Sequence, residues 1–513
     1  MCTPCKIPYP TLAGAEFTSI TAALVSNITV QVIEGLYPNH GAINREGVTF
    51  CHVTTSYTHT GRSDNVTVDV FLPVDWNGRL QAVGGGGWQA GGLDSPLSNF
   101  SMFGAVAEGY ATATTNAGLT GETPEGWAFE SPGKLNLGLF ENFGTTSLNE
   151  LSIVGKAVTK SYYGEPPKFS YFTGCSQGGR QGYKLAETYP DAFDGIAASA
   201  PALDFSGLGV GDLWPQTFMN TLGRYPWNCE IAANTDAAIA ACDANDGRVD
   251  NVIADPDACV FDPFSLVGTS ISCYDEHSPE TVEISELAAN VTNITWTGPR
   301  ATDGSFLWWG LEKGTRLVEE MTALGLNPGL ATTVCLADGT CSGNPFLVTI
   351  LWIQYLVKKD PNFDVTTITT EEFEDVFRAS RKEWAPVFDV EPNLDSFRDA
   401  GGKLISYHGL ADITVPSDGT RSFFEQVAAR DSTVHDYYRL FESPGLSHCL
   451  GGFGYYPAGT FDALVSWVEN GVAPETLVGT SPPREDGNVE TSVLCPYPKK
   501  TRYDGSESGI CVD

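Results

Sequence analysis

Basic side chains are scarce in this chain of 513 residues. Its 29 Lys and Arg residues stand against 63 Asp and Glu residues, which leaves a net charge of -34. A surface this acidic repels the phosphate backbone of DNA and RNA, so we expect no nucleic acid partner. Such a surface suits a secreted protein, often one that works at mildly acidic pH.

Long apolar runs are also absent. No stretch reaches the roughly 20 uncharged apolar residues that span a bilayer, so we expect no membrane partner. The N-terminus has no apolar core of a signal peptide. Met1 directly before Cys2 looks like a start residue added to a mature chain, so we expect that a secretory signal has been removed.

The cysteines lack the spacing of a zinc site, although the chain has 13 of them. Cys2 and Cys5 lie close together, but no matching second pair follows. Disulfides in an oxidising compartment are the better interpretation, and one cysteine must stay free in a monomer because thirteen is odd. Five sequons are compatible with glycosylation in a secretory pathway: Asn27, Asn65, Asn99, Asn290 and Asn293.

Strand and helix patterns alternate over the first 200 residues and again after residue 402, which is typical of an α/β sheet. We expect strands at 66–72, 79–83, 110–114, 169–172, 195–200, 403–407 and 437–441, and helices at 148–163, 180–189, 420–429 and 461–468. The intervening chain is richer in turns and local cysteines. Since 513 residues are too many for one compact core, we expect a catalytic domain of residues 1–204 and 395–513, with residues 205–394 inserted as a second domain.

A candidate nucleophile stands in the sequence Gly174-Cys175-Ser176-Gln177-Gly178. An aromatic run at 169–172 predicts a buried strand before it, and 180–189 predicts a helix behind it. Strand, Gly-x-Ser-x-Gly turn and helix make a nucleophile elbow, in which the glycines allow a turn tight enough to expose the serine hydroxyl. The pattern alone also fits an ordinary glycine-rich turn, but the strand at 195–200 continues the expected β/α unit.

A serine hydroxyl needs a base, and α/β-hydrolases supply the partners in the order serine, acid, histidine. Of the seven histidines, only His435 and His448 come late enough in the chain. His448 lies in the loop directly after the strand at 437–441, so we predict that it is the base. His435 is expected to be a surface residue at the edge of that strand.

The acid should follow the preceding strand, at 403–407. Asp412 lies in the loop after it and is the predicted acid. Asp418 and Glu442 are weaker candidates because they fall off the strand ends.

Four consecutive glycines, 84–87, follow the strand at 79–83 and precede Trp88. No Lys-Ser/Thr follows, so this is not a phosphate-binding loop. A hydrolase needs such a loop to aim an amide at the reacting oxygen. We predict an oxyanion hole formed by the backbone N–H of Gln177 and that of Gly86 or Gly87.

Both predicted catalytic residues have a cysteine beside them. Cys175 directly precedes Ser176, and Cys449 directly follows His448. If the serine and histidine touch, a Cys175–Cys449 disulfide can tie their loops together. Closing so long a loop is worth about 5 kcal/mol in the chain-entropy description.

These motifs together resemble the tannase and feruloyl esterase family of α/β-hydrolases. The resemblance covers nearly the whole chain and is carried by the Gly84 to Trp88 loop, Cys175-Ser176, 297–300 with Asp303-Gly304, 407–412 and His448-Cys449. It implies an α/β-hydrolase core with a large inserted lid domain, acting as a secreted serine esterase on esters of phenolic acids. No organic cofactor is implied.

The resemblance also implies a structural calcium ion in the inserted domain, at an acidic turn whose carboxylates would otherwise repel one another. The side chains of Asp243, Asp246 and Asp250 and the carbonyls of Arg248 and Val252 would ligate it. A Cys242–Cys259 disulfide would bracket the turn, and Cys2–Cys51 and Cys495–Cys511 match terminal bridges of the family. Cys335–Cys341 is a further local pairing, whereas Cys5, Cys229 and Cys273 have no clear partner.

We expect the acyl pocket between core and lid, with aromatic walls for a phenolic ring. Candidate wall residues are Trp308, Trp309, Phe346, Trp352 and Tyr355, although each of them also suits packing within the lid. The expected substrate is a hydroxycinnamate ester, either a small phenolic ester or a feruloylated cell-wall polysaccharide.

Three alternatives remain beside this expectation. A tannase would cleave gallate esters instead. A catalytically inactive secreted binding protein could have the same fold, but the intact Ser176, Asp412 and His448 argue against it. A cation-dependent hydrolase would use the acidic turn as its active site, and its activity would not survive chelation.

Overall fold

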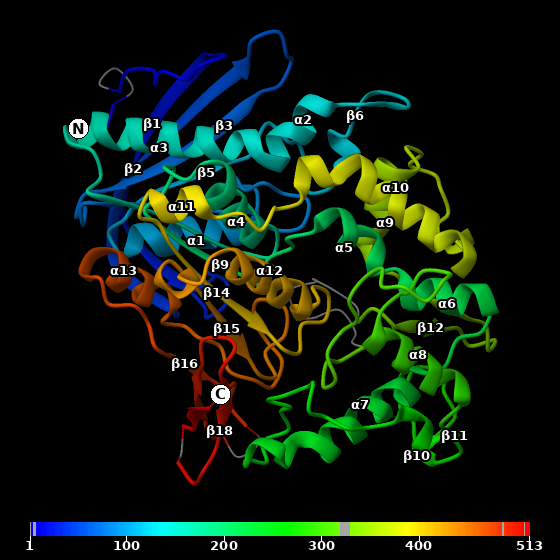
Figure 1. Ribbon diagram of the computed structural model, residues 1–513. Coiled ribbons are helices and arrows are strands. Elements are labelled where there is room, and N and C mark those ends of the chain that lie inside the picture. The colour runs from blue at the N-terminus through cyan, green and yellow to red at the C-terminus, as the bar shows by residue number, and fades with distance from the viewer. Residues whose placement is uncertain (1, 4–6, 319–328, 485–486, 507, 513) are drawn as a thin grey trace.

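The computed structural model describes residues 2–3, 7–318, 329–484, 487–506 and 508–512. Its centre is a nine-stranded sheet in the order β1-β2-β3-β5-β4-β8-β9-β14-β15 (Figure 1). The bounds of these strands are β1 Ala15–Val32, β2 Ile43–His59, β3 Val66–Pro73, β4 Arg79–Val83, β5 Ala111–Thr115, β8 Phe169–Cys175, β9 Gly195–Ser199, β14 Lys403–Gly409 and β15 Tyr438–Ser443.

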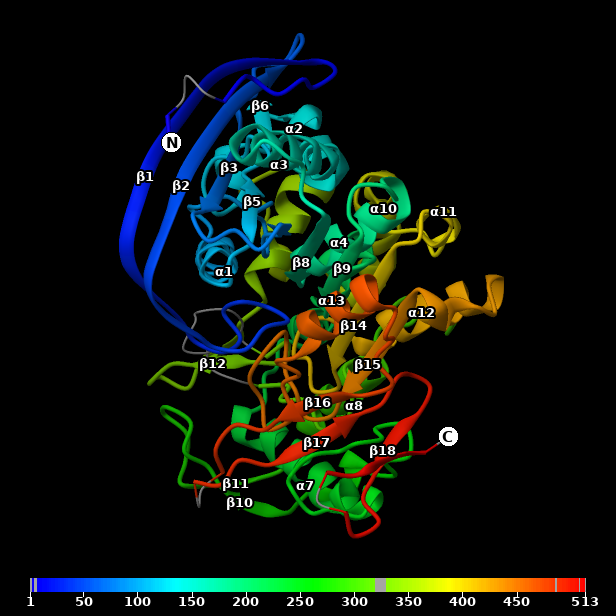
Figure 2. The same ribbon diagram turned by 90° about the vertical axis from the view of Figure 1, so that its left-hand side faces the viewer.

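The sheet is parallel from β5 through β15 and antiparallel from β1 to β5. The parallel strands are short and buried on both faces, as expected where helices cover a sheet on both sides. β1 and β2 form a long, curved antiparallel pair at the other edge, where most β1 side chains are partly or fully exposed (Figure 2).

Helices cover both faces of the parallel part. α1 (Pro96–Ala107) and α13 (Thr460–Asn470) pack in one apolar cluster on one face. The other face is covered by α3 Ser147–Tyr163, α4 Gln177–Thr188, α11 Asp395–Asp399 and α12 Ser417–Arg430. This arrangement is the α/β-hydrolase fold that the sequence predicts.

Residues 205–394, here named the insert, are built differently, and Figure 1 shows most of their helices to the right of and below the sheet. The insert holds helices α5 Phe205–Gly211, α6 Trp214–Leu222, α7 Asn228–Cys242, α8 Glu286–Thr297, α9 Leu347–Leu351 and α10 Thr370–Phe388. Its strands form two short hairpins: β10 Ser270–Ser272 with β11 Thr281–Glu283, and β12 Thr333–Cys335 with β13 Cys341–Gly343.

The insert is not packed as a separate body. Trp352 and Phe388 of the insert share one apolar cluster with Trp88, Trp127 and Phe143 of the core. A second cluster, around α6, α7 and α8, lies wholly within the insert. One half of the insert is therefore continuous with the hydrophobic core beside the sheet.

The remaining strands and the remaining α-helix are small and lie outside the main sheet. They are α2 Leu137–Glu141, the hairpin of β6 Phe129–Ser131 with β7 Lys134–Leu135, and two C-terminal hairpins, β16 Leu477–Thr480 with β17 Thr491–Leu494 and β18 Lys500–Arg502 with β19 Ile510–Val512.

Each strand and helix expected in the core is present, with ends that differ by a few residues. The pattern did not indicate β1, β2 or α1. β1 is exposed to solvent along most of its length, which weakens its apolar signal. β2 does alternate buried and partly exposed residues from 51 to 59, but its buried side chains include the polar Thr55 and His59, which interrupt the apolar pattern. No helix within the described residues is both long and apolar enough to cross a membrane.

The structure forms six disulfides, and five are the predicted pairs: Cys2–Cys51, Cys175–Cys449, Cys242–Cys259, Cys335–Cys341 and Cys495–Cys511. The sixth joins Cys229 to Cys273, which the sequence left without partners. Cys5, the remaining cysteine, lies outside the described residues.

Candidate active site

Ser176 occupies a sharp turn between the end of β8 and the start of α4. Its backbone has φ 64° and ψ -123°, a left-handed conformation that is unusual for a residue with a side chain. The turn closes tightly because a Cβ atom on Gly174 would lie 2.6 Å from the carbonyl carbon of Gly178. The two glycines of the motif therefore allow the elbow, and its backbone strain lifts the serine above the sheet.

Residues from three distant loops meet at this serine. His448 Nε2 lies 2.8 Å from Ser176 Oγ, and His448 Nδ1 lies 2.7 Å from Asp412 Oδ2. Both distances are ordinary hydrogen bonds, so one imidazole links the hydroxyl to the carboxylate. Asp412 follows β14 and His448 follows β15, as the sequence predicts.

The Asp412 carboxylate is almost fully buried yet well supplied with donors. The amides of Thr414 and Val415 donate to Oδ1 at 3.0 Å and 2.8 Å. Burial raises the pKa of Asp412, but the charge of His448 and the hydrogen bonds of His408 and His448 outweigh it and hold the pKa well below its ordinary value. The group stays ionised and can stabilise a charged imidazole.

His408 was not assigned a role from the sequence. Its Nε2 lies 3.2 Å from Asp412 Oδ2 and 3.0 Å from the carbonyl of Val415, and its Nδ1 lies 2.8 Å from Thr420 Oγ1. It is buried, and it contacts the same carboxylate oxygen as His448, so it helps to fix the acid loop.

The cysteines beside the serine and the histidine are bonded, with Cα atoms 6.0 Å apart. Cys449 has φ 64°, and its carbonyl accepts a hydrogen bond of 2.8 Å from the Tyr407 hydroxyl. The histidine loop is thus held to the elbow by a covalent bond and to β14 by a hydrogen bond.

The glycine loop after β4 lies against the start of α4. Gly84 donates its amide to the Thr173 carbonyl, and Gly85 donates to Gln181 Oε1 at 3.0 Å. A Cβ atom on Gly178 would lie 2.8 Å from the Gly85 carbonyl oxygen, so the loop and the elbow are in direct contact. Within the described residues, the amides of Gly86 and Gly87 donate to no protein acceptor, which is compatible with their predicted role.

Two buried polar residues, which the sequence motifs did not reveal, form hydrogen bonds with the residues around the elbow. Asn39 donates to Thr173 Oγ1 at 2.9 Å and accepts from Ser199 Oγ, which joins β8 to β9. Arg180 is fully buried and donates to Gln177 Oε1 at 2.7 Å. The hydrogen bond between Arg180 and Gln177 could have been predicted from the sequence, because Arg180 lies about one helical turn after Gln177.

Arg180 also connects the elbow to the insert. It donates to the carbonyl oxygens of Phe143, Gly144 and Phe388, and Phe388 ends α10 of the insert. Burial lowers the pKa of Arg180 to about 9, which still leaves it charged at neutral pH.

Of the predicted pocket aromatics, Trp308 and Trp309 lie at a cavity between core and insert. Core residues 201–203 and 415–416 line its other side. The Ala202 amide bonds the Ser176 carbonyl, and the Val415 amide bonds Asp412, so this cavity adjoins the site.

The other three aromatics lie within packed clusters. Trp352 is fully buried and donates to Ser380 Oγ, Tyr355 packs on Phe129, and Phe346 packs beside the cluster of α6 and α8. Their positions favour packing rather than a role in the pocket wall.

The weaker candidates lie away from the triad. Asp418 and Glu442 both bind the Arg421 guanidinium, and His435 packs on Phe424.

The predicted calcium loop contains three buried carboxylates, those of Asp243, Asp246 and Asp250. Asp243 accepts the amides of Asp250 and Asn251, and Asp246 accepts that of Arg248. Asp250 accepts from the Tyr455 hydroxyl through Oδ2, but its buried Oδ1 has no hydrogen-bond partner among the described residues. Burial raises the pKa of Asp250 to about 6, and the charges of Asp243 and Asp246 add to this.

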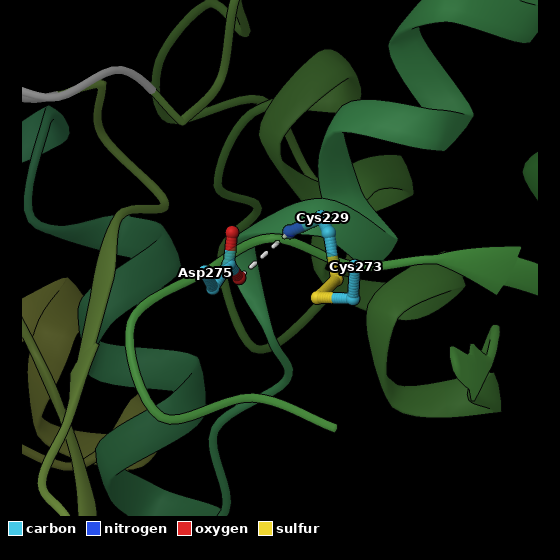
Figure 3. A group of neighbouring side chains, drawn as sticks. All are labelled: Cys229, Cys273 and Asp275. Carbon is cyan, nitrogen blue, oxygen red and sulfur yellow. Dashed lines mark hydrogen bonds between the residues drawn. A yellow bond between two sulfur atoms is a disulfide. The ribbon is translucent and has the colours of Figure 1, made fainter. Parts of the chain in front are cut away.

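These observations fit a hard cation, because clustered buried carboxylates and an unsatisfied oxygen are what such an ion would compensate. The carboxylate oxygens of these three aspartates do not all lie within 4.8 Å of one another, however. Among the described residues, the one group of His, Cys, Asp or Glu side chains that meets this spacing is Cys229, Cys273 and Asp275 (Figure 3). Its two thiols form a disulfide, and the Asp275 carboxylate accepts the Cys229 amide at 3.0 Å. This second group is therefore a stabilised bridge and not a metal site.

Comparisons with known proteins agree with this geometry. A family model described as tannase and feruloyl esterase matches residues 51–513. A probable feruloyl esterase of Arthroderma benhamiae is 37% identical, over 98% of this chain and 91% of its own length.

Two solved structures cover nearly the whole chain, each at 26% identity. The tannin acyl hydrolase of Aspergillus niger has a TM-score of 0.88, covering 100% of this chain and 95% of that one. Feruloyl esterase B of Aspergillus oryzae has a TM-score of 0.76, covering 98% and 97%.

The sheet, the elbow and the Ser-His-Asp arrangement define an α/β-hydrolase with a serine nucleophile. Within that class the chain belongs to the tannase and feruloyl esterase family, and it is a carboxylic ester hydrolase.

Proposed function

We propose that this enzyme hydrolyses esters of hydroxycinnamic acids, with Ser176 as nucleophile, His448 as base and Asp412 as orienting acid. The observation that supports this most directly is the continuous hydrogen-bonded line from Asp412 through His448 to Ser176. The substrate class follows the names of the sequence relatives, which are probable feruloyl esterases.

The reaction would proceed as two acyl transfers. His448 takes the Ser176 proton as Oγ attacks the ester carbonyl, and the charged imidazole is stabilised by Asp412. His448 then returns the proton to the leaving alcohol. Water repeats the sequence on the acyl-enzyme and releases the free acid.

The oxyanion would be bound by the amide of Gln177 and that of Gly86 or Gly87. Gln177 is the first residue of α4, so its amide is oriented by the helix, and the glycine loop lies against the same turn. Each such donor is typically worth about 3 kcal/mol in the transition state.

The acyl group would enter the cavity beside Trp308 and Trp309. That cavity has a volume of about 20 Å³, and a single water already needs 10–15 Å³ on the same scale. A phenolic ring would therefore need a wider opening between the insert and the core, which would make the insert a lid.

Gallate ester hydrolysis is the second candidate. It is favoured by the higher TM-score of the tannin acyl hydrolase, 0.88 against 0.76 for feruloyl esterase B. Both candidates use the same triad and differ only in the acyl group.

Initial rates on methyl ferulate, methyl caffeate, methyl p-coumarate and methyl gallate test the proposal. We expect turnover of the cinnamates by the wild type and a loss of more than about 10⁴-fold in kcat for Ser176→Ala. Turnover of gallate alone would replace the first candidate with the second. If folded wild-type enzyme cleaves none of the four, both substrate classes are wrong.

We further propose that the acidic loop binds a structural calcium ion through Asp243, Asp246 and Asp250 and the carbonyls of Arg248 and Val252. When bound, the ion would supply charge compensation only and take no part in the ester chemistry.

Six disulfides favour an oxidising, extracellular site of action for the chain. Glycans would be attached at the five sequons, of which Asn27 and Asn65 are the most exposed in the structure.

A further inference from the structure

We propose that Asp212 is a specificity-determining residue whose carboxyl group hydrogen-bonds the ring hydroxyl of the phenolic acyl group. This inference rests on the function proposed above and assigns a residue to the inner end of the acyl pocket.

Asp212 lies one helical turn beyond a residue of the acyl cavity. Leu208 lines that cavity, and Asp212, four residues later at the end of α5, lines a second one. Residues four apart share one face of a helix, so one face of α5 runs along both cavities. Trp309 and Pro416 line both as well, which makes the second cavity a continuation of the first.

The Asp212 carboxyl is buried and incompletely bonded. Its side chain is only 3% exposed, and Oδ2 has no hydrogen-bond partner among the described residues. The Trp214 indole N–H, at the same second cavity, is also buried without a partner in that part of the chain. An unsatisfied buried polar atom costs about 1–3 kcal/mol, so two around one cavity point to a polar occupant.

The surroundings of Asp212 favour its neutral form, which would suit an uncharged ligand. Burial, followed by the negative charge of Asp412, raises the pKa of Asp212 well above its ordinary value. A neutral carboxyl group both donates and accepts, as a phenolic hydroxyl does. The negative charge of Asp412, which acts on Asp212, would also disfavour an anionic ligand beside it.

The adjoining surface suits an aromatic ring. Trp309 and Pro416 provide apolar walls between the triad side and Asp212. A ring held there, with its carbonyl at Ser176, would direct its hydroxyl away from the serine and into the polar end.

The first test needs only wild-type enzyme and two esters that differ by one hydroxyl. We expect kcat/KM for methyl p-coumarate to exceed that for methyl cinnamate by about 10- to 100-fold. Equal values would overturn the role of Asp212 while leaving the esterase proposal intact. If neither ester is cleaved, the proposed function fails first.

The second test locates the effect. Asp212→Leu removes the hydrogen bond, and we expect the ratio of the two kcat/KM values to fall about tenfold or more. Asp212→Asn keeps both a donor and an acceptor in the same shape and should retain most of the ratio. Asp399→Leu, a change at a side chain that is 68% exposed, is the matched control.

The ratio of the two kcat/KM values also distinguishes recognition of the ring hydroxyl from a purely structural role of Asp212. If Asp212 only supports the fold or binds a buried water, Asp212→Leu lowers both kcat/KM values alike, and the inference is wrong. If Asp212→Leu does not fold, the wild-type comparison and Asp212→Asn still test the inference. The Asn variant keeps a donor and an acceptor, so a loss of the preference for methyl p-coumarate over methyl cinnamate in that variant would contradict a hydrogen-bonding role.

Discussion

The core and the insert are stabilised in different ways. The core has a sheet of nine strands with helices on both faces, and Ser176, Asp412 and His448 all follow strands of that sheet. In the insert, the strands are three residues long, and three of the six disulfides among the described residues join cysteines 6, 17 and 44 positions apart. The regular part therefore fixes the distances within the triad, whereas the irregular part lines one side of the proposed acyl pocket.

The two regions meet through polar contacts as well as apolar ones. Arg180 reaches from the elbow to the end of α10, and Arg421 of α12 reaches Glu312 and Asp257 of the insert. These contacts couple the insert directly to the elbow and to α12.

Removal of the Cys175–Cys449 bridge is the largest expected disturbance of the core. Its sequence separation is 274 residues, so the double variant Cys175→Ser with Cys449→Ser should lose about 5 kcal/mol of unfolding free energy. We also expect kcat to fall, since the bridge joins the residues beside the nucleophile and the base. Denaturant titration and initial rates measure the two effects.

The matched change in the insert is Cys335→Ser with Cys341→Ser, where the separation is 6 residues. We expect a loss of about 2 kcal/mol there and little change in kcat. Equal losses in both double variants, with kcat retained in both, would contradict the distinction between core and insert.

Chelation should affect the insert next most strongly. Free calcium at a concentration of 100 times its Kd would stabilise the folded enzyme by about 2.7 kcal/mol. We expect excess EGTA to lower the melting temperature, and added calcium to restore it, whereas the esterase rate well below the melting temperature should persist.

Asp250→Asn should weaken that response, with Asp236→Asn, an exposed carboxylate on α7, as the control. A melting temperature that does not respond to EGTA would remove the calcium proposal. Instant loss of hydrolysis on chelation would point to a cation in the chemistry instead.

The core could be predicted from sequence because its signals are local. The short apolar strands and the Gly174 to Gly178 turn each occupy a few neighbouring residues. Asp412 and His448 could be found because each lies in the loop directly after a recognisable strand, in the chain order serine, acid, histidine. Each local signal agreed with the others, which is why the triad and the bridge beside it could be predicted together.

The rest depends on contacts that no local pattern encodes. Asn39 reaches the elbow across 134 residues, and Cys229 pairs with Cys273 across 44. Nothing in the local sequence distinguishes Asp212 from an ordinary aspartate at the end of a helix. Its burial becomes visible only once α5 is packed beside Trp308 and Trp309.

The smallest effect we predict is a pH dependence at the contact between core and insert. Glu312 is buried near Asp418, Glu442, Asp257 and Lys500, with Arg421 among them. Burial first, and then the charge of Asp418, raises the pKa of Glu312 to about 8 from the ordinary 4.5. The stability that this group contributes is therefore complete below pH 4.5 and is lost as the pH rises through about 8.

Glu312→Gln stays neutral at every pH and should remove this loss. We expect the melting temperature of the wild type to fall by about 2–4 °C more than that of the variant between pH 6 and 9. Glu383→Gln, at an exposed ion pair with Lys359 in the insert, is the control and should follow the wild type. Parallel curves for wild type and Glu312→Gln would mean that Glu312 is already ionised in the folded enzyme. The contact between core and insert would then be equally strong across this pH range.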